Sequence, residues 1–591
     1  MLKNIQFETL KQIQEYFILT QHNVEDYKKY EKDIVNLFNT GEINFNIDSS
    51  AYFNYIGMYY KYVMKDYDRM EKYFLMAIEK ENHYAMNNLG VYHYEITKDY
   101  DQMKRYYLMA IEKGNSDSMN NLGIYYHKIM KDYNQMEKYY LMAIEKGDSN
   151  SMTNFGHYHH EITKNYNQME KYYLMAIEKG NSYGMINLGC YYYEITKYDQ
   201  MEKYYQMAIK KGNKEAMNNL GSYHQYITKD YTQMEKYYLM AIEKDHSDSM
   251  NNLGVYYHKI AMDYNRMEKY YLMAIEKDNL NSMYNLGNYH QYITKDYNQM
   301  EKYYLMAIKK GDSDSMNNLG VYYHKIAMDY NRMEKYYLMA IEKDNLNSMY
   351  NLGNYHYETT KDYNQMEKYY LMAIEKGHSG SMNNLGNYYE ITKNYNQMEK
   401  YYLMAIEKGH SGAMNNLGNY HHEVTKDYNK MAKYYLMAIE KGNSDAMNNL
   451  GHYYKITKDY NQMEKYYLMA IGKKNSDAMY NLGNYHYKNT KVYNQMEKYY
   501  MMAIEIDKEN FHAMYNLGTY HYEITKDYDQ MEKYYIMAIE KGNTDAMNNL
   551  GFYHHKITKN YDLMKKYYMM AIEKGHSKAM HNFKYYHDNG K

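Results

Sequence analysis

Histidine is the residue type in this sequence whose spacing comes closest to a chemical motif. The chain has 26 histidines, and many lie three or four residues after a glycine that recurs along the sequence. Imidazole is a frequent ligand of zinc and copper, and His157 with His160 has the i, i+3 spacing of a ligand pair. However, acidic and cysteine partners do not repeat beside these histidines, and tyrosine occupies the same positions elsewhere. We therefore predict no metal site and interpret the histidines as polar aromatic residues that line a groove.

Cys190 and the tyrosines are the other candidates for chemistry. Cys190 directly follows one of the recurring glycines, at a position that holds Val, Ile, Asn, His, Ser, Thr or Phe in other places. A position that varies this freely predicts a packing or surface residue and not a nucleophile. Among the 91 tyrosines, those such as Tyr139 and Tyr140 are predicted to be core, whereas Tyr92, Tyr125 and Tyr126 are candidates for partner contact. No catalytic residue and no cofactor is predicted.

The recurring glycine marks a repeat that organises the whole chain. The mean spacing is about 33 residues, which is typical of a solenoid whose units bury their apolar faces against one another. The sixteen glycines are Gly57, Gly90, Gly123, Gly156, Gly189, Gly221, Gly254, Gly287, Gly320, Gly353, Gly386, Gly418, Gly451, Gly483, Gly518 and Gly551. Three intervals are one residue shorter, with the deletions near the turn inside the unit. Changes confined to turns are what a stacked array tolerates.

Each unit is predicted to fold as a helical hairpin. In residues 115–147 the apolar stripe of the first helix has 3.6-residue spacing and consists of Ser118, Leu122, Tyr125 and Ile129. The second helix repeats the pattern with Met136, Tyr139, Tyr140, Ala143 and Ile144. Asp132 is predicted to cap the second helix by accepting from its free amides, and Gly147 to end it in the left-handed conformation. Gly123, which is unfavourable in mid-helix, indicates a close helix crossing.

Composition limits the class of protein. With 71 basic and 73 acidic residues the net charge is −2, so no basic field predicts nucleic-acid binding. A single cysteine and the lack of any Asn-x-Ser/Thr sequon indicate a reduced, intracellular and cytoplasmic setting. No apolar run approaches the roughly 20 residues of a membrane-spanning helix, and the first residues do not read as a signal peptide. We expect no membrane insertion.

The two ends of the chain differ from the repeat. Residues 1–50 lie outside the period and are predicted to form a helical N-terminal cap for the solenoid of residues 51–591; a separate docking motif is the alternative. One predicted helix of this cap contains Ile5, Phe7, Leu10, Ile13 and Phe17, and the other contains Tyr27, Tyr30, Ile34, Leu37 and Phe38. The last unit is degenerate, because Phe583 and Lys584 replace Leu-Gly.

These residues carry a family resemblance. The order A-M-N-N-L-G-x-Y, a short turn with Asp, and M-x-x-Y-Y-x-x-A-I-x-x-G resembles the Sel-one-like repeat of the tetratricopeptide-like superfamily. The matching positions in one unit are Ser118, Leu122, Gly123, Tyr125, Tyr139, Tyr140, Ala143, Ile144 and Gly147. Met136 departs from the family's usual alanine, Tyr139 from its frequent tryptophan, and the turn is shorter. The resemblance covers about residues 51–587 and implies an all-α superhelix of about 16 helical hairpins.

The resemblance also implies a function. The first helices of successive units are expected to line a concave groove, and such proteins commonly act as adaptors in multiprotein complexes. We predict a non-enzymatic scaffold that binds a peptide or protein segment, with partners of unknown identity and an unknown oligomeric state. The candidate groove residues are Tyr92, His93, Tyr126, His127, His160, His224, His258, His290, His324, His356, His421, His486 and His521. An RNA-reading repeat protein is the rival, but it needs a cationic groove and acidic residues recur here, as at Glu95 and Glu194. A spacer without a groove ligand is the third reading.

Overall fold

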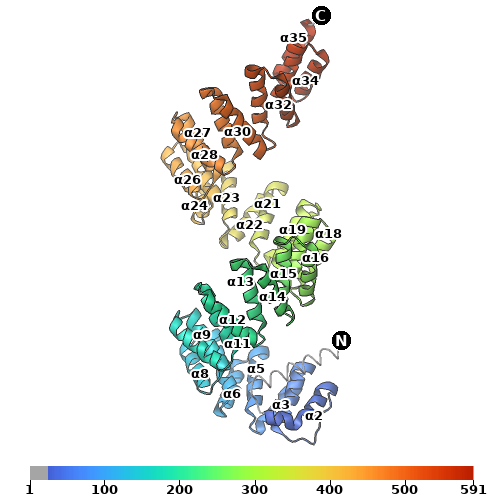
Figure 1. Cartoon of the computed structure of the whole chain (residues 1–591), viewed down its shortest axis with the longest axis vertical. Helices are drawn as coiled ribbons and strands as arrows, with labels where there is room; N and C mark the ends of the chain where they lie inside the picture. The colour runs from blue at the N-terminus through green and yellow to red at the C-terminus, as the bar shows by residue number, and fades with distance from the viewer. Residues whose placement is uncertain (1–23, 590–591) are drawn as a thin grey trace. The chain divides into compact units, whose positions relative to one another are not determined.

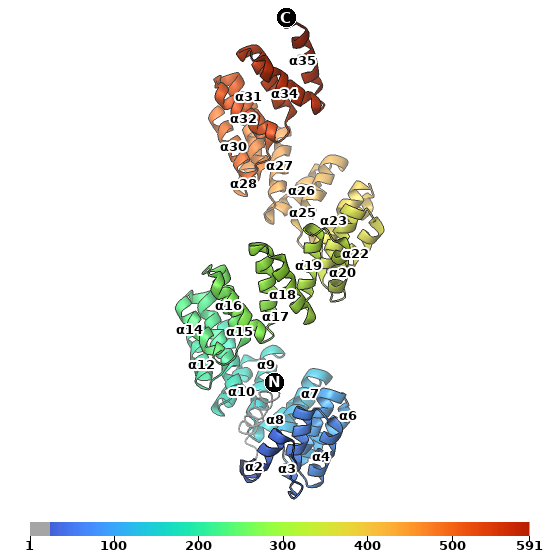
Figure 2. The same cartoon turned by 90° about the vertical axis from the view of Figure 1, so that its right-hand side faces the viewer.

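Helical hairpins make up the structure. The computed structural model describes residues 24–589, and within that range every regular element is a helix and no strand occurs. The chain divides into two units, Met1–Tyr303 and Tyr304–Lys591. Within each unit, consecutive helices pack as hairpins, and each hairpin packs on the next one along the chain (Figures 1 and 2). The predicted all-α hairpin-repeat fold is confirmed.

The first helices of the hairpins are of two kinds. In ten of them a short α-helix continues into a π-helical turn, labelled η. These are α3 (Ser50–Tyr59) with η1 (Tyr60–Met64), α5 (His83–Tyr92) with η2 (His93–Thr97), α7 (Ser116–Tyr125) with η3 (Tyr126–Met130), α13 (Lys214–Tyr223) with η4 (His224–Thr228), α17 (Leu280–Tyr289) with η5 (His290–Thr294), α21 (Leu346–Tyr355) with η6 (His356–Thr360), α25 (Ser411–Tyr420) with η7 (His421–Thr425), α29 (Ser476–Tyr485) with η8 (His486–Thr490), α31 (Phe511–Tyr520) with η9 (His521–Thr525), and α33 (Thr544–Tyr553) with η10 (His554–Thr558). The others are α-helical throughout: α9 (Ser149–Glu161), α11 (Ser182–Glu194), α15 (Ser247–Lys259), α19 (Ser313–Lys325), α23 (Ser379–Ile391) and α27 (Ser444–Ile456).

The second helices are more uniform, and almost all begin at the tyrosine that follows an Asp or Asn cap. They are α4 (Tyr67–Glu79), α6 (Tyr100–Glu112), α8 (Tyr133–Glu145), α10 (Tyr166–Glu178), α12 (Tyr198–Lys210), α14 (Tyr231–Ile242), α16 (Tyr264–Glu276), α18 (Tyr297–Lys309), α20 (Tyr330–Ile341), α22 (Tyr363–Glu375), α24 (Tyr395–Glu407), α26 (Tyr428–Glu440), α28 (Tyr460–Gly472), α30 (Tyr493–Ile506), α32 (Tyr528–Glu540) and α34 (Tyr561–Glu573). The predicted helix signals hold in α8: the Asp132 side chain accepts from the Gln135 amide at 3.1 Å, and Gly147, just past its end, has a φ of 83°.

The recurring glycine lies where two helices cross. A Cβ on Gly123 would lie 2.5 Å from Cδ1 of Tyr140, whose ring is almost completely buried. The same tyrosine position faces the recurring glycine in fourteen repeats, that of Gly123 included, and Phe74 faces Gly57 in the first. No side chain fits between the helices here, which explains why a residue that weakens a helix recurs. The predicted close crossing is confirmed.

Polar side chains connect successive hairpins beside this core. The buried Ser118 hydroxyl donates to Asn87 Oδ1 at 2.9 Å, and the Asn121 amide donates to the same oxygen at 3.1 Å. Asn87 belongs to the preceding repeat, so each such cluster joins neighbours. Buried polar groups must be paired to avoid a desolvation penalty, and this arrangement therefore fixes the stacking register as well as contributing stability.

The prediction for Ile129 in the core stripe is wrong. Its side chain is 45% exposed, whereas Leu122 and Tyr125 are buried. The reason is its place at the C-terminal end of the first helix, because Ile162, Ile260 and Ile326 hold the same position after α9, α15 and α19, which have no π turn, and are equally exposed. The π-helical turn η3 ends at Lys131, which has a φ of 55°. The three shorter repeats lie on α11, α23 and α27, and none of these helices has a π turn. The full-length repeats of α9, α15 and α19 also lack a π turn, so repeat length alone does not decide where the turn forms.

The two ends have their own packing. Helix α2 (Val24–Thr40) buries Ile34, Leu37 and Phe38 against Tyr52 and Ile56 of α3. The first predicted N-terminal helix, with Ile5 through Phe17, lies outside the described residues. At the other end α35 (Ser577–Asn589) packs Phe583 against α34, while Lys584 is exposed.

Candidate binding surface

A polar hollow lies between neighbouring first helices of unit 2. It has a volume of about 460 Å³, and the residues that line it come mainly from α21, η6 and α23. They are Asn354, Tyr357, Glu358, Tyr370, Asn384, Asn387, Glu390 and Ile391. Counted from the recurring glycine of each repeat, most occupy positions plus one, plus four and plus five. We call these three positions the groove face.

Hydrogen bonds hold two of the side chains that line this hollow, Asn387 and Glu390. Tyr402 donates from its hydroxyl, which lies 2.7 Å from Asn387 Oδ1 and 2.6 Å from a carboxylate oxygen of Glu390. The Asn416 amide, one repeat further on, donates to Asn387 Oδ1 at 2.9 Å. The Tyr402 ring is buried, and this burial raises the pKa of its hydroxyl, so the phenol remains a donor. These hydrogen bonds position the amide of Asn387 and the carboxylate of Glu390.

The histidines at glycine plus three lie inside the repeat. The His290 ring stacks on Tyr303 of the second helix at 5.7 Å with an interplanar angle of 7°, and its Nδ1 lies 3.0 Å from the Thr294 hydroxyl. The same two contacts are made by His93, His224, His356, His421, His486 and His521. Burial lowers the pKa of each of these histidines, so the neutral form is favoured.

The tyrosine candidates also pack within the array. Tyr126, at glycine plus three, stacks on Tyr139 at 5.7 Å with an angle of 3° and takes the place of histidine. Tyr92, at glycine plus two, packs at 5.4 Å on Tyr67, the first residue of the preceding second helix. Both side chains are half-buried. Their aromatic area is therefore used mainly between helices of the protein.

The histidines at glycine plus four occupy a different place. The His127 ring meets Tyr158 of the next repeat edge-on at 5.7 Å and 88°. His258 and His324 meet Tyr289 and Tyr355 in the same way, and all three rings are half-buried. Burial lowers the pKa of His127, His258 and His324. These rings lie at the junction of two repeats and on the groove face.

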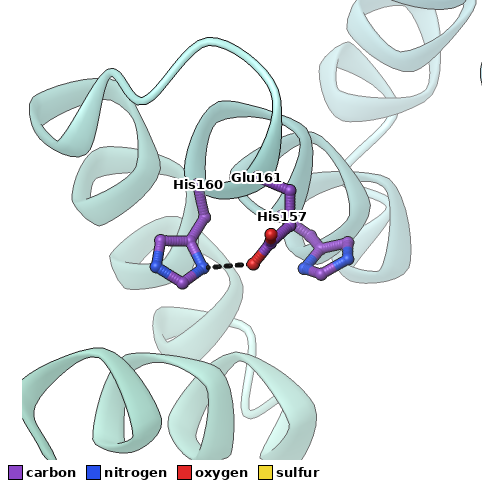
Figure 3. Close-up of side chains that lie close together, drawn as sticks. All are labelled: His157, His160 and Glu161. Carbon is purple, nitrogen blue, oxygen red and sulfur yellow. Dashed lines mark ion pairs between the residues drawn. The ribbon is translucent and has the colours of Figure 1, made fainter. Parts of the chain in front are cut away.

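One repeat gathers several groups that could hold a metal ion. His157, His160 and Glu161 lie on α9, and one ligand atom from each lies within 4.8 Å of the others (Figure 3). His160 Nδ1 is 3.0 Å from Glu161 Oε1, and its Nε2 is 3.2 Å from Glu194 Oε2 of the next first helix. Sequence reasoning treated the histidines as a repeated set and so missed this local carboxylate. The signal was the direct adjacency of Glu161 to His160.

Cys190 shows no sign of an activated thiol. Its side chain is half-buried, and the Tyr205 hydroxyl donates to its Sγ at 3.3 Å. Burial raises the pKa of this thiol, which leaves it protonated and unreactive at neutral pH.

Between residues 24 and 589, no helix combines the length and the apolar character that crossing a membrane requires.

Comparison with known proteins gives both a family and similar structures. The Sel1 repeat model matches ten segments that together cover about half of the sequence: 83–115, 116–148, 214–246, 280–312, 346–378, 379–410, 411–443, 476–489, 511–543 and 544–576. No curated protein matches the sequence.

Several solved structures are similar to this chain. The protective antigen c5321 of uropathogenic Escherichia coli, which has an SLR fold, is 20% identical over 76% of this chain and 95% of its own, with a TM-score of 0.34. A Sel1 repeat protein from Oxalobacter formigenes is 23% identical over 38% of this chain and 100% of its own, with a TM-score of 0.32. Yeast Tom70 is 13% identical over 84% of this chain and 97% of its own, with a TM-score of 0.35.

Proposed function

The chain belongs to the Sel1 repeat family, and from this membership we propose that it is a non-catalytic scaffold that binds a peptide or protein segment along the groove face. Sel1 repeat proteins are generally protein-interaction scaffolds. The proposed contact residues include the histidines at glycine plus four, namely His127, His160, His258 and His324, together with the plus-one and plus-five positions of the same repeats. The intracellular setting and the capping role of residues 1–50 belong to the same proposal.

The hollow in unit 2 is the observation that carries the proposal. Its lining includes three asparagines, whose amides both donate and accept hydrogen bonds, as the backbone of an extended peptide requires. Glu358 and Glu390 add two carboxylates, which favour a Lys or Arg side chain of the partner. Tyr357 supplies an aromatic surface at low entropic cost. These features fit a polar segment with at least one basic residue.

The same lining disfavours RNA as the ligand. Carboxylates repel phosphate, and sequence-tolerant binding of nucleic acid needs a cationic surface. The plus-five position also carries Glu95, Glu194 and Glu523 in other repeats, so the acidic character is not confined to one hollow. A basic peptide segment is therefore the better match.

The test is peptide selection against the full chain followed by affinity measurement. A displayed peptide library supplies a ligand, and its dissociation constant is measured for the wild-type chain and for the double variant Glu358→Gln/Glu390→Gln. We expect the double variant to weaken binding by about tenfold or more, because each carboxylate pairs with a basic side chain of the ligand. Glu375→Gln is the matched control, since Glu375 is exposed at the end of α22 and does not line the hollow. Equal affinity of the double variant and the control would contradict the proposal.

A further inference from the structure

We propose that His157, His160 and Glu161 bind a divalent transition-metal ion of the zinc class. The three residues occupy positions i, i+3 and i+4 of α9, so their side chains project from one face of the helix. Figure 3 shows the Glu161 carboxylate between the two imidazole rings. Their ligand atoms lie within 4.8 Å of one another, and small side-chain rotations bring them to the separation of neighbouring ligands around one ion.

The surroundings of His160 carry the argument. Its two ring nitrogens each lie within hydrogen-bond distance of a carboxylate oxygen, 3.0 Å to Glu161 and 3.2 Å to Glu194. A neutral imidazole has only one N–H, so it can donate to only one of these carboxylates. In this neutral form the other nitrogen presents its lone pair to a second carboxylate oxygen, whereas a protonated ring would pair with both carboxylates. A cation bound between that nitrogen and that oxygen removes the repulsion between their lone pairs, and both atoms serve as its ligands.

The geometry assigns a separate role to each carboxylate. Nε2 of His160 is paired with Glu194 on α11 at 3.2 Å, which orients the ring and leaves Nδ1 as the ligand atom. Glu161 then supplies Oε1, because its Oε2 lies 3.7 Å from Lys164 Nζ. Glu194 is thus a positioning residue that holds the ligand His160. A histidine held by a carboxylate in this way is the usual arrangement at protein metal sites.

The donor set selects the class of ion. Two imidazole nitrogens and one carboxylate oxygen suit zinc or a neighbouring transition-metal ion, whereas magnesium and calcium prefer oxygen ligands. His157 and Glu161 are exposed and His160 is half-buried, so water can complete the coordination. Within residues 24–589, this is the one group of three His, Cys, Asp or Glu side chains with such spacing.

The chain contains its own comparison for this site. The repeat of Gly418 has the same His-Glu pair, His422 and Glu423, but Asn419 stands where the metal-site repeat has His157. In the following repeat Ile456 stands where Glu194 does. One ligand and the positioning carboxylate are therefore both missing, and we expect no tight site at His422.

The experiment is a zinc titration of the full chain by isothermal calorimetry after treatment with a chelator and its removal. We expect one zinc ion per chain to bind tightly (the tight equivalent), in addition to weak binding of zinc by other histidines. His157→Asn, which copies the Gly418 repeat, and His160→Gln should each weaken this equivalent by about tenfold or more. Glu194→Gln should weaken the zinc affinity of this site by about 10- to 100-fold, the range for removing a residue that orients a metal ligand. His422→Gln is the control and should leave the tight equivalent unchanged.

Two results would overturn the site. One is the lack of a tight equivalent in the wild-type chain, which would mean that His160 is only paired with its carboxylates. The other is equal zinc affinity in His157→Asn, His160→Gln and His422→Gln, which would mean that zinc spreads over surface histidines. Far-UV circular dichroism of each variant shows that the helices are kept, so neither result can be attributed to unfolding.

Discussion

His421 and His422 are neighbours in the sequence and have different structural roles. The His421 ring is buried, stacks on Tyr434 at 5.6 Å and 7°, and places Nδ1 3.0 Å from the Thr425 hydroxyl. The His422 ring is half-buried and meets Tyr453 of the next repeat edge-on at 6.2 Å and 89°. A step of one residue rotates a side chain by about 100° around a helix, which moves it from the interior of the repeat to the groove face.

The comparison separates positions that build the repeat from positions that are available to a partner. Glycine plus three is filled only by rings, His or Tyr, that stack on the second helix, as Tyr126 and His421 do. Glycine plus four accepts His, Tyr, Gln, Glu or Lys. Restriction to one shape indicates packing. Glycine plus four is buried at Lys61, Gln225 and Gln291 and half-buried at His422, and its tolerance of many side chains lets different repeats present different chemistry there.

The largest expected effect on stability comes from removing the ring of Tyr434, on which His421 stacks. Tyr434 is 9% exposed and packs against Ala413 and Leu417. We expect Tyr434→Ala to lower the free energy of unfolding by about 3 kcal/mol, the range for deleting a buried aromatic ring. The measurement is urea unfolding of the full chain followed by far-UV circular dichroism. Tyr434→Phe keeps the stacked ring and should lose no more than about 1 kcal/mol. Equal losses in the two variants would show that the ring is not what supports His421.

The hairpin architecture could be predicted from the sequence because it depends on local signals repeated many times. The Asp132 cap, the left-handed Gly147 and the close approach at Gly123 each follow from the conformational limits of one residue type. The π turns could not be predicted from apolar spacing, since a single apolar residue such as Ile129 fits either an α or a π turn. The one-residue deletions at α11, α23 and α27 accompany regular α-helices, but the full-length α9, α15 and α19 are regular as well, so the deletions mark only part of the pattern.

The candidate site was predictable only in part. Positions plus one, plus four and plus five share a helix face by their i, i+3, i+4 spacing, which the sequence contains. Position plus three does not share that face, and the interchange of His and Tyr there reflects a common stacking partner. The cluster of His157, His160 and Glu161 occurs in one repeat alone. Reasoning from the average repeat therefore could not reveal it.

Lowering the pH tests the buried position of His421 by a second route, with a smaller expected effect on the free energy of unfolding. Burial lowers the pKa of His421, so the folded state binds a proton less readily than the unfolded state, in which the pKa is about 6.5. The stability from this group is complete above about pH 6.5 and is lost as the pH falls toward the lowered value. We expect the urea midpoint of the wild-type chain to fall between about pH 7 and pH 5.

A variant copied from other repeats tests the source of this pH dependence. His421→Tyr places at this position the ring that Tyr389 and Tyr454 supply in theirs. The Tyr389 hydroxyl donates to Glu367 at 2.6 Å, and Glu399 is the residue equivalent to Glu367 for position 421. We expect the variant to be as stable as wild type at neutral pH and to lose less stability on acidification. An unchanged pH dependence would assign the effect to other histidines.

Substitution of His422 is expected to have the smallest effect on stability and completes the comparison. Its half-buried ring contacts the next repeat through one edge, and the same position in the repeat of Gly221 holds Gln225, which is buried and accepts from the Tyr238 hydroxyl at 2.8 Å, so glutamine fits there. We therefore expect His422→Gln to change the free energy of unfolding by less than about 0.5 kcal/mol, the range for surface substitutions. His421→Gln, one residue away, should cost about 1 to 2 kcal/mol because it removes the stacked ring and the contact with Thr425. Both values come from the same urea titration. If His422→Gln were the more destabilising of the two, glycine plus four would belong to the packing of the array, and the proposed groove face would lose that position.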